Sequence, residues 1–329
     1  MLTSIDPGAA GRHVPGKAIA AVLLLATCSA PAATLTPTPA QTPDRPLVVM
    51  AVGDIACDPA DPNFKSGTGT STLCRQRDTA SLLAGADLVL LLGDNQYECG
   101  GLAAYRASFD LSWGPFKSRI RPAIGNHEHN ATAGLKGIGT NCDATHAAAG
   151  YYTYFGSAAP AGAYSFDAGA WHFATVDSTC SQARMKCAAE ASWLSNDLAA
   201  HPTACSIVFY HHPRWSSGGH GDTLQSDPFW RAAVAAGAKI ILNGHDHDYE
   251  RFAPMDANGA ASAAGVREFV VGTGGRDLTP IPTIQPNSVV RNGATFGVLK
   301  LTLHVGTYEW QFMPIAGQTF TDQGTGSCH

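Results

Sequence analysis

Residues 86–97, with the sequence ADLVLLLGDNQY, form an apolar run that ends abruptly at Gly93 and Asp94. The run has no polar positions at helical spacing, so it predicts a strand that is buried on both faces. The glycine allows the backbone to turn sharply where the strand ends. Asp94 should therefore lie at the carboxyl end of a buried strand, which is where open α/β sheets bind their ligands.

The same arrangement, an apolar run that stops at glycine or polar residues, occurs five more times. The five runs occupy residues 47–54, 120–128, 205–213, 238–247 and 267–275. Four of them end in side chains that can bind metal, namely Asp54, Asn126, His211, His245 and His247. Together with Asp94 these side chains supply carboxylate, amide and imidazole ligands, a set that suits iron, manganese or zinc. The sequence therefore predicts a metal site at the rim of an α/β fold.

The composition is that of a folded protein that does not bind nucleic acid. The chain has 329 residues, of which 45% are hydrophobic and 14% are charged, so it can bury a large core. Its formal net charge is -5, and no run of Lys or Arg provides a basic surface for DNA or RNA. We therefore expect a small-molecule partner and no nucleic-acid binding, and the oligomeric state stays open.

The N-terminus has the pattern of an export signal. Basic residues precede residues 18–30, AIAAVLLLATCSA, an apolar core that is too short to span a bilayer comfortably. We predict a signal peptide over residues 1–33, with lipid attachment at Cys28 as the alternative. The Pro/Thr-rich residues 34–46 predict an extended linker, and residues 47–329 a folded domain. A secreted or extracytoplasmic protein without a transmembrane span is expected.

The cysteine count agrees with export. Nine cysteines are present, and removal or lipidation of Cys28 leaves eight, enough for four disulfides. Eight cysteines allow 105 pairings. Proximity along the chain favours Cys57 with Cys74, Cys99 with Cys142 and Cys180 with Cys187, which leaves Cys205 with Cys328. A thiolate metal site is the competing interpretation, but the chain has no CxxC pair.

Helices and further strands are expected around the six runs. Helical patterns cover residues 75–83, 189–200 and 227–237. Alternating apolar residues predict antiparallel strands at 151–155, 163–167 and 171–177, and a hairpin at 296–314. We interpret His172 as a residue of one of these strands and not as a metal ligand. Two sheets flanked by helices account for this order.

Five short motifs, taken in order, resemble those of the calcineurin-like metallophosphoesterases. They are GD at 53–54, GDNQY at 93–97, GNHE at 125–128, VFYH at 208–211 and GHDH at 244–247. Tyr97, three residues after Asp94, makes the match closer to the purple acid phosphatases. The likeness is to their small single-domain type, because we expect only a signal and a linker before Leu47 and because residues 211–221, HHPRWSSGGHG, resemble that type. The resemblance implies an α/β fold, a two-sheet αββα sandwich, with residues 47–329 as the catalytic domain. One departure is Ala56, which stands where the family usually has glycine.

The resemblance also implies two metal ions that share one carboxylate. The first ion would take Asp54, Asp94, Tyr97 and His247. The second would take Asp94, Asn126, His211 and His245. The first set gathers two carboxylates and a phenolate, so it suits Fe(III), with Fe(II), Zn(II) or Mn(II) as the partner in the second. The alternative for Tyr97 is a buried aromatic residue beside two divalent ions.

The family places two further histidines near the substrate, and His127 and His220 correspond to them. As imidazolium groups they would bind the phosphoryl oxygens and protonate the leaving group. His212 should be free of metal because the VFYH motif selects His211. Glu128 and His129 are equally compatible with hydrogen bonds to ligands or with solvation, and Arg276 is a weak candidate for a phosphate contact.

The function that follows is that of a secreted binuclear metal-dependent phosphohydrolase. We expect an acid phosphomonoesterase with metal-bound hydroxide as nucleophile, because a trivalent ion generates hydroxide at lower pH than a divalent one. A phosphodiesterase or nucleotide hydrolase with the same metals is the alternative. A secreted binding protein without catalytic activity is a remote alternative, since no metal ligand of the family pattern is missing.

Overall fold

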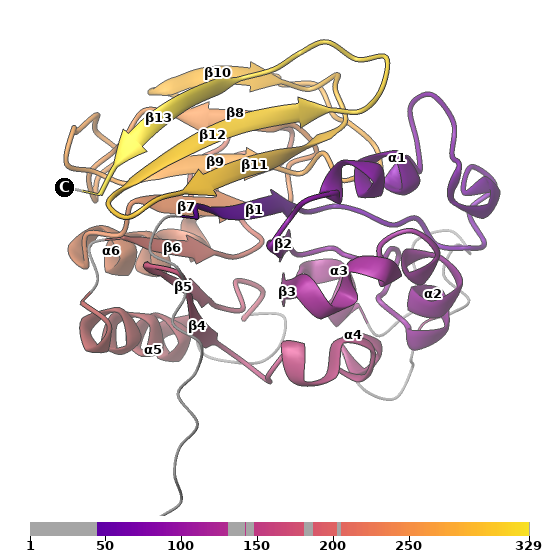
Figure 1. The fold of residues 1–329 in the computed structure, drawn as a ribbon, viewed down its shortest axis with the longest axis horizontal. Coiled ribbons are helices and arrows are strands. Elements are labelled where there is room, and N and C mark those ends of the chain that lie inside the picture. The colour runs from indigo at the N-terminus through magenta and orange to yellow at the C-terminus, as the bar shows by residue number, and fades with distance from the viewer. Residues whose placement is uncertain (1–44, 131–141, 143–147, 181–186, 203–204, 329) are drawn as a thin grey trace, which may run out of the picture. The chain divides into compact units, whose positions relative to one another are not determined.

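The computed structural model describes residues 45–130, 142, 148–180, 187–202 and 205–328. Two β-sheets lie face to face in this part of the chain, and helices cover part of their outer faces (Figure 1). The predicted α/β sandwich is therefore confirmed. The predicted signal peptide and all but the last two residues of the predicted linker lie outside the described residues.

The first sheet has six strands in the order β13-β12-β11-β1-β2-β3. Its strands are β1 (Leu47–Val52), β2 (Leu88–Leu92), β3 (Ile120–Ala123), β11 (Gly297–Leu303), β12 (Thr307–Pro314) and β13 (Gln323–Ser327). Strands β1, β2 and β3 are parallel and form one side of this sheet, with β3 at its edge, and β11 joins β1 antiparallel. All five residues of β2 are buried, as its apolar run predicts. The predicted hairpin is confirmed as β11 and β12.

The second sheet has seven strands in the order β10-β8-β9-β7-β6-β5-β4. Its strands are β4 (Tyr164–Ala168), β5 (Trp171–Thr175), β6 (Ser206–Phe209), β7 (Ile240–Asn243), β8 (Tyr249–Phe252), β9 (Arg267–Val271) and β10 (Ser288–Asn292). The strands β5, β6, β7 and β9 run parallel to one another. The second sheet thus places its parallel strands at its centre, whereas those of the first sheet form one side of it and end at the edge strand β3.

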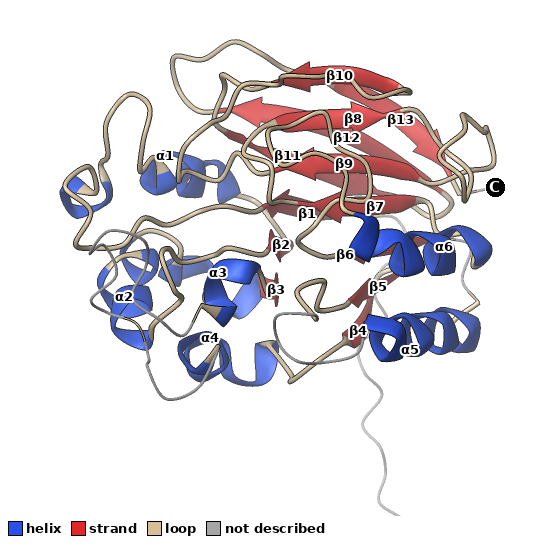
Figure 2. Cartoon of the chain, turned by 180° about the vertical axis from the view of Figure 1, so that it is seen from behind, coloured by secondary structure: helices blue, strands red, loops and turns tan. Residues whose placement is uncertain are grey.

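Side chains alternate between the two faces of the second sheet, as the period of a strand requires. Ile207 and Phe209 of β6 join the core between the sheets, whereas Val208 packs outward with Leu194 and Trp230 of the covering helices. Figure 2 shows these two helices, α5 and α6, side by side on the outer face. The second sheet is therefore buried on both faces at its centre.

Within the described residues, six α-helices and several 3-10 helices connect the strands. The α-helices are α1 (Gln76–Ala80), α2 (Leu102–Ala107), α3 (Asn126–His129), α4 (Ala149–Phe155), α5 (Cys187–Ala200) and α6 (Asp227–Ala235). The described 3-10 helices are Lys65–Gly67, Ser81–Leu83, Phe109–Leu111, Gly114–Arg119, Gly156–Ala158 and Leu224–Ser226. Helices predicted at 75–83, 189–200 and 227–237 are confirmed as α1 with its 3-10 extension, α5 and α6.

The predicted strand at residues 151–155 is wrong, because this segment forms the end of α4. Tyr151, Tyr154 and Phe155 are the buried aromatic residues of the segment, and their spacing of three and four residues is helical. The ring of Tyr154 stacks on that of Tyr105 in α2 at 4.8 Å between centroids. Packing of aromatic rings between two helices therefore overrides the strand propensity of the segment.

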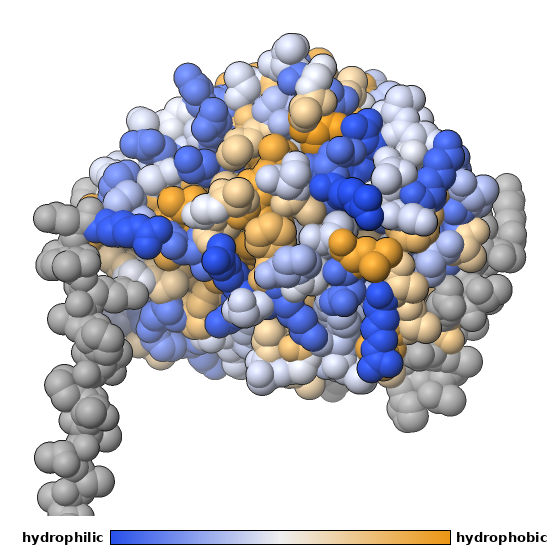
Figure 3. All heavy atoms as spheres, turned by 45° about the vertical axis from the view of Figure 1, so that its right-hand side comes forward, coloured by the Kyte–Doolittle hydropathy of each residue, from blue (hydrophilic) through white to orange (hydrophobic). Residues whose placement is uncertain are grey.

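All four predicted disulfides are present. They join Cys57 to Cys74, Cys99 to Cys142, Cys180 to Cys187 and Cys205 to Cys328. Among the described residues, no helix combines the length and apolarity needed to cross a membrane. Hydrophobic and hydrophilic residues are interspersed on the face drawn in Figure 3. Four disulfides are consistent with a protein that folds in an oxidising compartment.

Candidate metal centre

The predicted metal ligands lie where five parallel strands end. Asp54 follows β1, Asp94 follows β2 and Asn126 follows β3, so the first sheet supplies three positions. His211 follows β6 and His245 follows β7 in the second sheet. The carboxyl ends of these strands meet at one rim of the sandwich, so residues far apart in sequence come together there.

Three of the predicted ligands adopt a left-handed backbone conformation. The φ angles of Asp54, Asp94 and His245 are 61°, 47° and 72°, a region that residues other than glycine rarely occupy. The preceding glycines leave room for the neighbouring ligands: a Cβ atom on Gly93 would lie 2.6 Å from Nδ1 of His211. Strained backbone of this kind clusters at functional sites.

Four ligand atoms of the predicted first metal site converge. The hydroxyl oxygen of Tyr97 lies 2.9 Å from Oδ1 of Asp54, 3.3 Å from Oδ2 of Asp94 and 3.0 Å from Nε2 of His247. Nε2 of His247 also lies 3.3 Å from Oδ1 of Asp54. Ligand atoms about 2.0–2.2 Å from one ion lie about 3 Å from each other, so this spacing fits coordination.

The atoms of the predicted second site continue from the first. Nε2 of His211 lies 3.2 Å from Oδ2 of Asp94 and 3.1 Å from Oδ1 of Asn126. Nδ1 of His211 donates to the carbonyl oxygen of Leu92 at 2.9 Å, which leaves Nε2 to face the other ligands. The ring of His245 lies 5.0 Å from that of His211 between centroids. The structure thus brings all seven predicted ligands together around Asp94.

The two carboxylates divide their oxygens in the same way. Oδ2 of Asp54 accepts the backbone N–H of His245 at 2.8 Å, and Oδ1 of Asp94 accepts that of His127 at 2.8 Å. The other oxygen of each carboxylate faces the converging ligand atoms. Each aspartate is therefore held by a backbone donor and keeps one oxygen for a cation.

Protons compensate the buried charge in this cluster. Burial acts to lower the pKa of His247, but Asp54 and Asp277 outweigh it and raise the pKa to about 10. Burial is likewise outweighed at His211, whose pKa Asp94 raises to about 9. Burial and the adjacent carboxylates raise the pKa of Tyr97. Metal binding would displace these protons, because a metal ligand must be deprotonated. The donor set and its spacing fit two metal ions.

Asp277 is a residue of the site that the sequence analysis missed. Its Oδ1 lies 2.6 Å from Nδ1 of His247. A carboxylate on the far nitrogen fixes the ring and its tautomer, which leaves Nε2 free for a metal. Asp277 follows β9, the strand of the apolar run at 267–275. A polar residue just after this run was the sequence feature that could have identified Asp277 as part of the site.

Glu128 holds the loop that carries Asp94, which resolves the alternatives left for it. Its wholly buried carboxylate accepts the backbone N–H groups of Asp94 at 3.1 Å, Asn95 at 2.7 Å and Gly125 at 2.8 Å. The hydroxyl of Tyr105 also donates to it at 3.0 Å. Glu128 therefore ties the ends of β2 and β3 together.

His127 and His220 lie on different sides of the predicted ligands. The ring of His127 lies 4.3 Å from that of Tyr97, and its Nδ1 is 2.7 Å from the carbonyl oxygen of Glu98. The ring of His220 lies 4.3 Å from that of His245. Their side chains are 25% and 51% exposed, so a substrate can reach both.

Asp246 positions His220 and is a second residue that the sequence analysis missed. Its Oδ1 accepts the backbone N–H of His220 at 2.7 Å and lies 3.0 Å from the ring Nδ1. Asp246 stands between two predicted ligands in the GHDH motif, where its role could not be separated from theirs.

Three other histidines have protein partners. His212 contacts the hydroxyl of Ser178 through Nδ1 at 3.0 Å, and burial lowers its pKa to about 3. Nε2 of His129 lies 2.8 Å from Oδ2 of Asp177. His172, in β5, lies between the carboxylates of Asp167 and Asp197 at 2.7 and 2.9 Å.

Comparison with known proteins gives one family and a shared fold. The family model of the calcineurin-like phosphoesterases matches residues 47–249. No curated protein sequence matches the chain.

Three solved structures are similar to the chain. Purple acid phosphatase PPD1 from yellow lupin seeds aligns with a TM-score of 0.63 at 20% identity, over 86% of this chain and 54% of that one. GAP50, the anchor in the inner membrane complex of Plasmodium, gives 0.54 at 10% identity, over 85% and 88%. PhoD gives 0.51 at 12% identity, over 85% and 68%. The chain thus spans about half of the lupin phosphatase, and these likenesses show the fold.

Proposed function

The chain belongs to the calcineurin-like phosphoesterase family, and from this premise we propose that it is a secreted acid phosphomonoesterase. Membership makes it a metal-dependent phosphoester hydrolase of a family that uses a binuclear metal centre. The preference for monoesters, the identity of the metals, the individual ligands and the export are our proposal. In it, residues 1–33 are the signal peptide, 34–46 the linker and 47–329 the catalytic domain.

The observation that carries the proposal is the placement of the Tyr97 hydroxyl. It lies 2.9 Å from a carboxylate oxygen of Asp54 and 3.0 Å from Nε2 of His247, among the atoms proposed to hold the first ion. A phenolate with two carboxylates favours a trivalent ion in the first site. Asn126, His211 and His245, which share only Asp94 with the first site, suit Fe(II), Zn(II) or Mn(II) in the second.

When bound, two such ions clamp the attacking and leaving oxygens of the phosphate ester and lower the pKa of water towards about 7. The chain's own residues would orient the ester and move the proton. His127 and His220 approach the centre from different sides, so one imidazolium can bind the phosphoryl oxygens while the other protonates the leaving group. The carbonyl of Glu98 and the carboxylate of Asp246 orient these two rings.

Four disulfides support export, because such bonds persist in oxidising compartments. The predicted signal peptide points the same way. Export can be tested directly. If the chain is exported, it should be cleaved near residue 33 and recovered outside the cytoplasm.

The function is tested by metal analysis together with rates on paired substrates. We expect two metal ions per chain and faster hydrolysis of 4-nitrophenyl phosphate than of bis(4-nitrophenyl) phosphate in mild acid. Faster hydrolysis of the diester would favour the phosphodiesterase alternative. Metal binding without hydrolysis of either ester would favour a binding protein and contradict the proposal.

A further inference from the structure

Arg276 lies against the predicted first metal site although no motif includes it. It belongs to the loop that follows β9, and its guanidinium carbon is 5.2 Å from the centroid of the Tyr97 ring. A guanidinium at this distance is attracted to the face of an aromatic ring. The side chain is only 19% exposed, so Arg276 is largely enclosed by the protein.

Two carboxylates flank the guanidinium. Nη2 of Arg276 lies 2.8 Å from Oε1 of Glu98, and Nη1 lies 4.0 Å from Oδ1 of Asp277. The same oxygen of Asp277 accepts the hydrogen bond from Nδ1 of His247. The backbone carbonyl of Glu98 is the partner of Nδ1 of His127. Arg276 therefore stands between the group that orients a proposed metal ligand and the group that orients a proposed substrate histidine.

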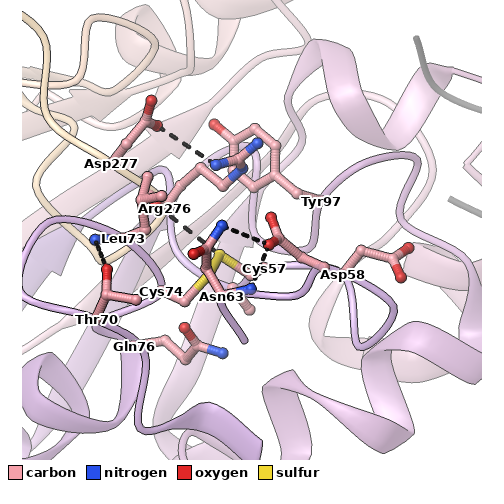
Figure 4. Close-up of a disulfide and its surroundings, with 12 residues drawn as sticks. Cys57, Asp58, Asn63, Thr70, Leu73, Cys74, Gln76, Tyr97, Arg276 and Asp277 are labelled. Atoms are coloured by element: carbon pink, nitrogen blue, oxygen red, sulfur yellow. Dashed lines mark hydrogen bonds and ion pairs between the residues drawn. A yellow bond between two sulfur atoms is a disulfide. The ribbon is translucent and has the colours of Figure 1, made fainter. Parts of the chain in front are cut away.

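The backbone of Arg276 is fixed on two sides. Its N–H donates to the carbonyl oxygen of Asp54 at 3.0 Å, and its own carbonyl oxygen accepts the N–H of Cys74 at 3.1 Å. Cys74 is bonded to Cys57, and Figure 4 shows this disulfide beneath Arg276, with Tyr97 and Asp277 above it. The guanidinium is thus presented from an anchored stretch of chain.

We propose that Arg276 is a positioning residue of the metal centre. Through Asp277 it holds the ring of His247 in the orientation that binds metal, and through Glu98 it holds the loop that orients His127. This inference rests on the proposed function. A direct contact with substrate phosphate fits the charges less well, because Glu98 and Asp277 already neutralise the guanidinium and would repel an approaching anion.

The first test is the affinity of the purified chain for zinc(II), measured by competition with a chelator. Loss of a partner that orients a metal ligand typically costs 10–100-fold in affinity. Arg276 acts one contact further out, through Asp277, so we expect Arg276→Gln to weaken one of two zinc sites by about tenfold, the lower end of that range, and to leave the other within about threefold. Arg276→Lys should recover part of the loss, because it keeps the charge and loses only the planar fork.

Arg267→Gln is the matched control at the other end of β9. Arg267 also lies over an aromatic ring, with its guanidinium carbon 4.7 Å from the centroid of Trp310, and it donates to the carbonyl of Phe252 at 3.1 Å. Its Nε, like that of Arg276, is buried without a hydrogen-bond partner. Both zinc affinities should be unchanged in Arg267→Gln. If Arg267→Gln lost as much zinc affinity as Arg276→Gln, the effect of Arg276→Gln would reflect a general loss of protein stability. That result would overturn the inference.

A double-mutant cycle with Asp277→Asn tests the route. If Arg276 acts through Asp277, Arg276→Gln should weaken zinc binding much less when Asp277→Asn is already present. Full additivity would overturn that route. An increase in KM for a phosphate ester with unchanged zinc affinity would make Arg276 a substrate contact and overturn the inference. The wild-type chain separates a failure of this inference from a failure of the proposed function. If it binds two zinc ions and hydrolyses esters, the proposed function stands even when the Arg276 variants contradict the inference. If it does neither, the proposed function and the inference are both contradicted.

Discussion

The two sheets contribute different chemistry to the centre. Loops of the six-stranded sheet bring the proposed oxygen ligands, and loops of the seven-stranded sheet bring the proposed imidazole ligands. The oxygen set is Asp54, Asp94, Tyr97 and Asn126, and the imidazole set is His211, His245 and His247. Neither sheet carries the complete donor set of either proposed ion. Metal binding therefore depends on the packing of one sheet against the other.

The two sets are also held in place by opposite kinds of partner. Backbone N–H groups donate to the carboxylates, as His127 does to Asp94. Acceptors take a hydrogen bond from Nδ1 of the imidazoles, the nitrogen that faces away from the proposed metal. The carbonyl of Leu92 does so for His211, and the carboxylate of Asp277 for His247. A carboxylate needs donors to fix it, whereas an imidazole needs an acceptor that selects its tautomer. Each set of proposed ligands therefore has its own supporting hydrogen-bond partners, and the two groups of partners can be removed separately.

The largest effect should come from the one ligand that both proposed ions share. Asp94→Ala should abolish activity and lower the metal content of both sites. His245→Ala is the matched variant from the imidazole set, and it should release only the second ion. Element analysis of both variants measures the difference. Two metals per chain and normal turnover in Asp94→Ala would rule out this carboxylate as the bridge.

The next largest effect concerns His127 and His220, the two histidines proposed to contact substrate, which come from loops of different sheets. His127→Ala and His220→Ala should keep both metals. The variant that removes the proton donor should lose about 10²–10⁴-fold in rate.

A series of esters identifies which histidine protonates the leaving group. An acid matters most when the leaving group is poor, so the loss should be large for alkyl phosphates and small for 4-nitrophenyl phosphate. A loss that is constant across the series in both variants would leave these histidines as phosphate-binding groups only.

A smaller change in rate is expected for Tyr97→Phe, which removes one oxygen from the first site. The variant should retain substantial activity, but the visible charge-transfer band of phenolate bound to Fe(III) should disappear. Absorption spectra of the iron-loaded, oxidised proteins measure this. A colourless wild-type protein in that form would argue against the purple-type centre and leave the family unaffected.

The smallest effect on activity should follow from breaking the covalent link between the sheets. Cys205 precedes β6 and Cys328 follows β13, so their disulfide lies at the end of the strands opposite the centre. Cys205→Ser with Cys328→Ser should lower the free energy of unfolding by about 2–5 kcal/mol and leave metal content unchanged at 25 °C.

Denaturant unfolding and element analysis measure these two quantities. The comparison variant is Cys57→Ser with Cys74→Ser, which removes a disulfide beside the proposed metal centre. This variant should also bind metal more weakly. Loss of metals in the Cys205 and Cys328 variant would mean that the far link sets the register of the two ligand sets.

Six strands, β1, β2, β3, β6, β7 and β9, could be predicted from sequence because their apolar runs are continuous and stop at glycine or polar residues. The edge strands β10 and β13 and the inner strand β8 were missed, since segments such as Tyr249–Phe252 and Gln323–Ser327 are short or polar and become strands only by pairing with a neighbour. Residues 151–155 were assigned wrongly because their aromatic residues satisfy both strand propensity and helical spacing.

The proposed ligands could be named from the family resemblance of five motifs, and all of them stand within five residues of a strand end. Their supporting residues could not. Asp277 is 30 residues from His247, and Glu128 is 33 residues from Asn95. Such pairs are formed by the packing of loops from different strands, which no local pattern encodes.

The division of the ligands between the sheets sets when the protein can acquire its metals. Asp54 and His247 are placed together only after nearly two hundred intervening residues have been synthesised and both sheets have formed. A site of this kind does not exist in the unfolded chain. If the chain crosses the membrane unfolded, the ions are selected from those available where it folds, and the metal content reports on that compartment and not on the cytoplasm.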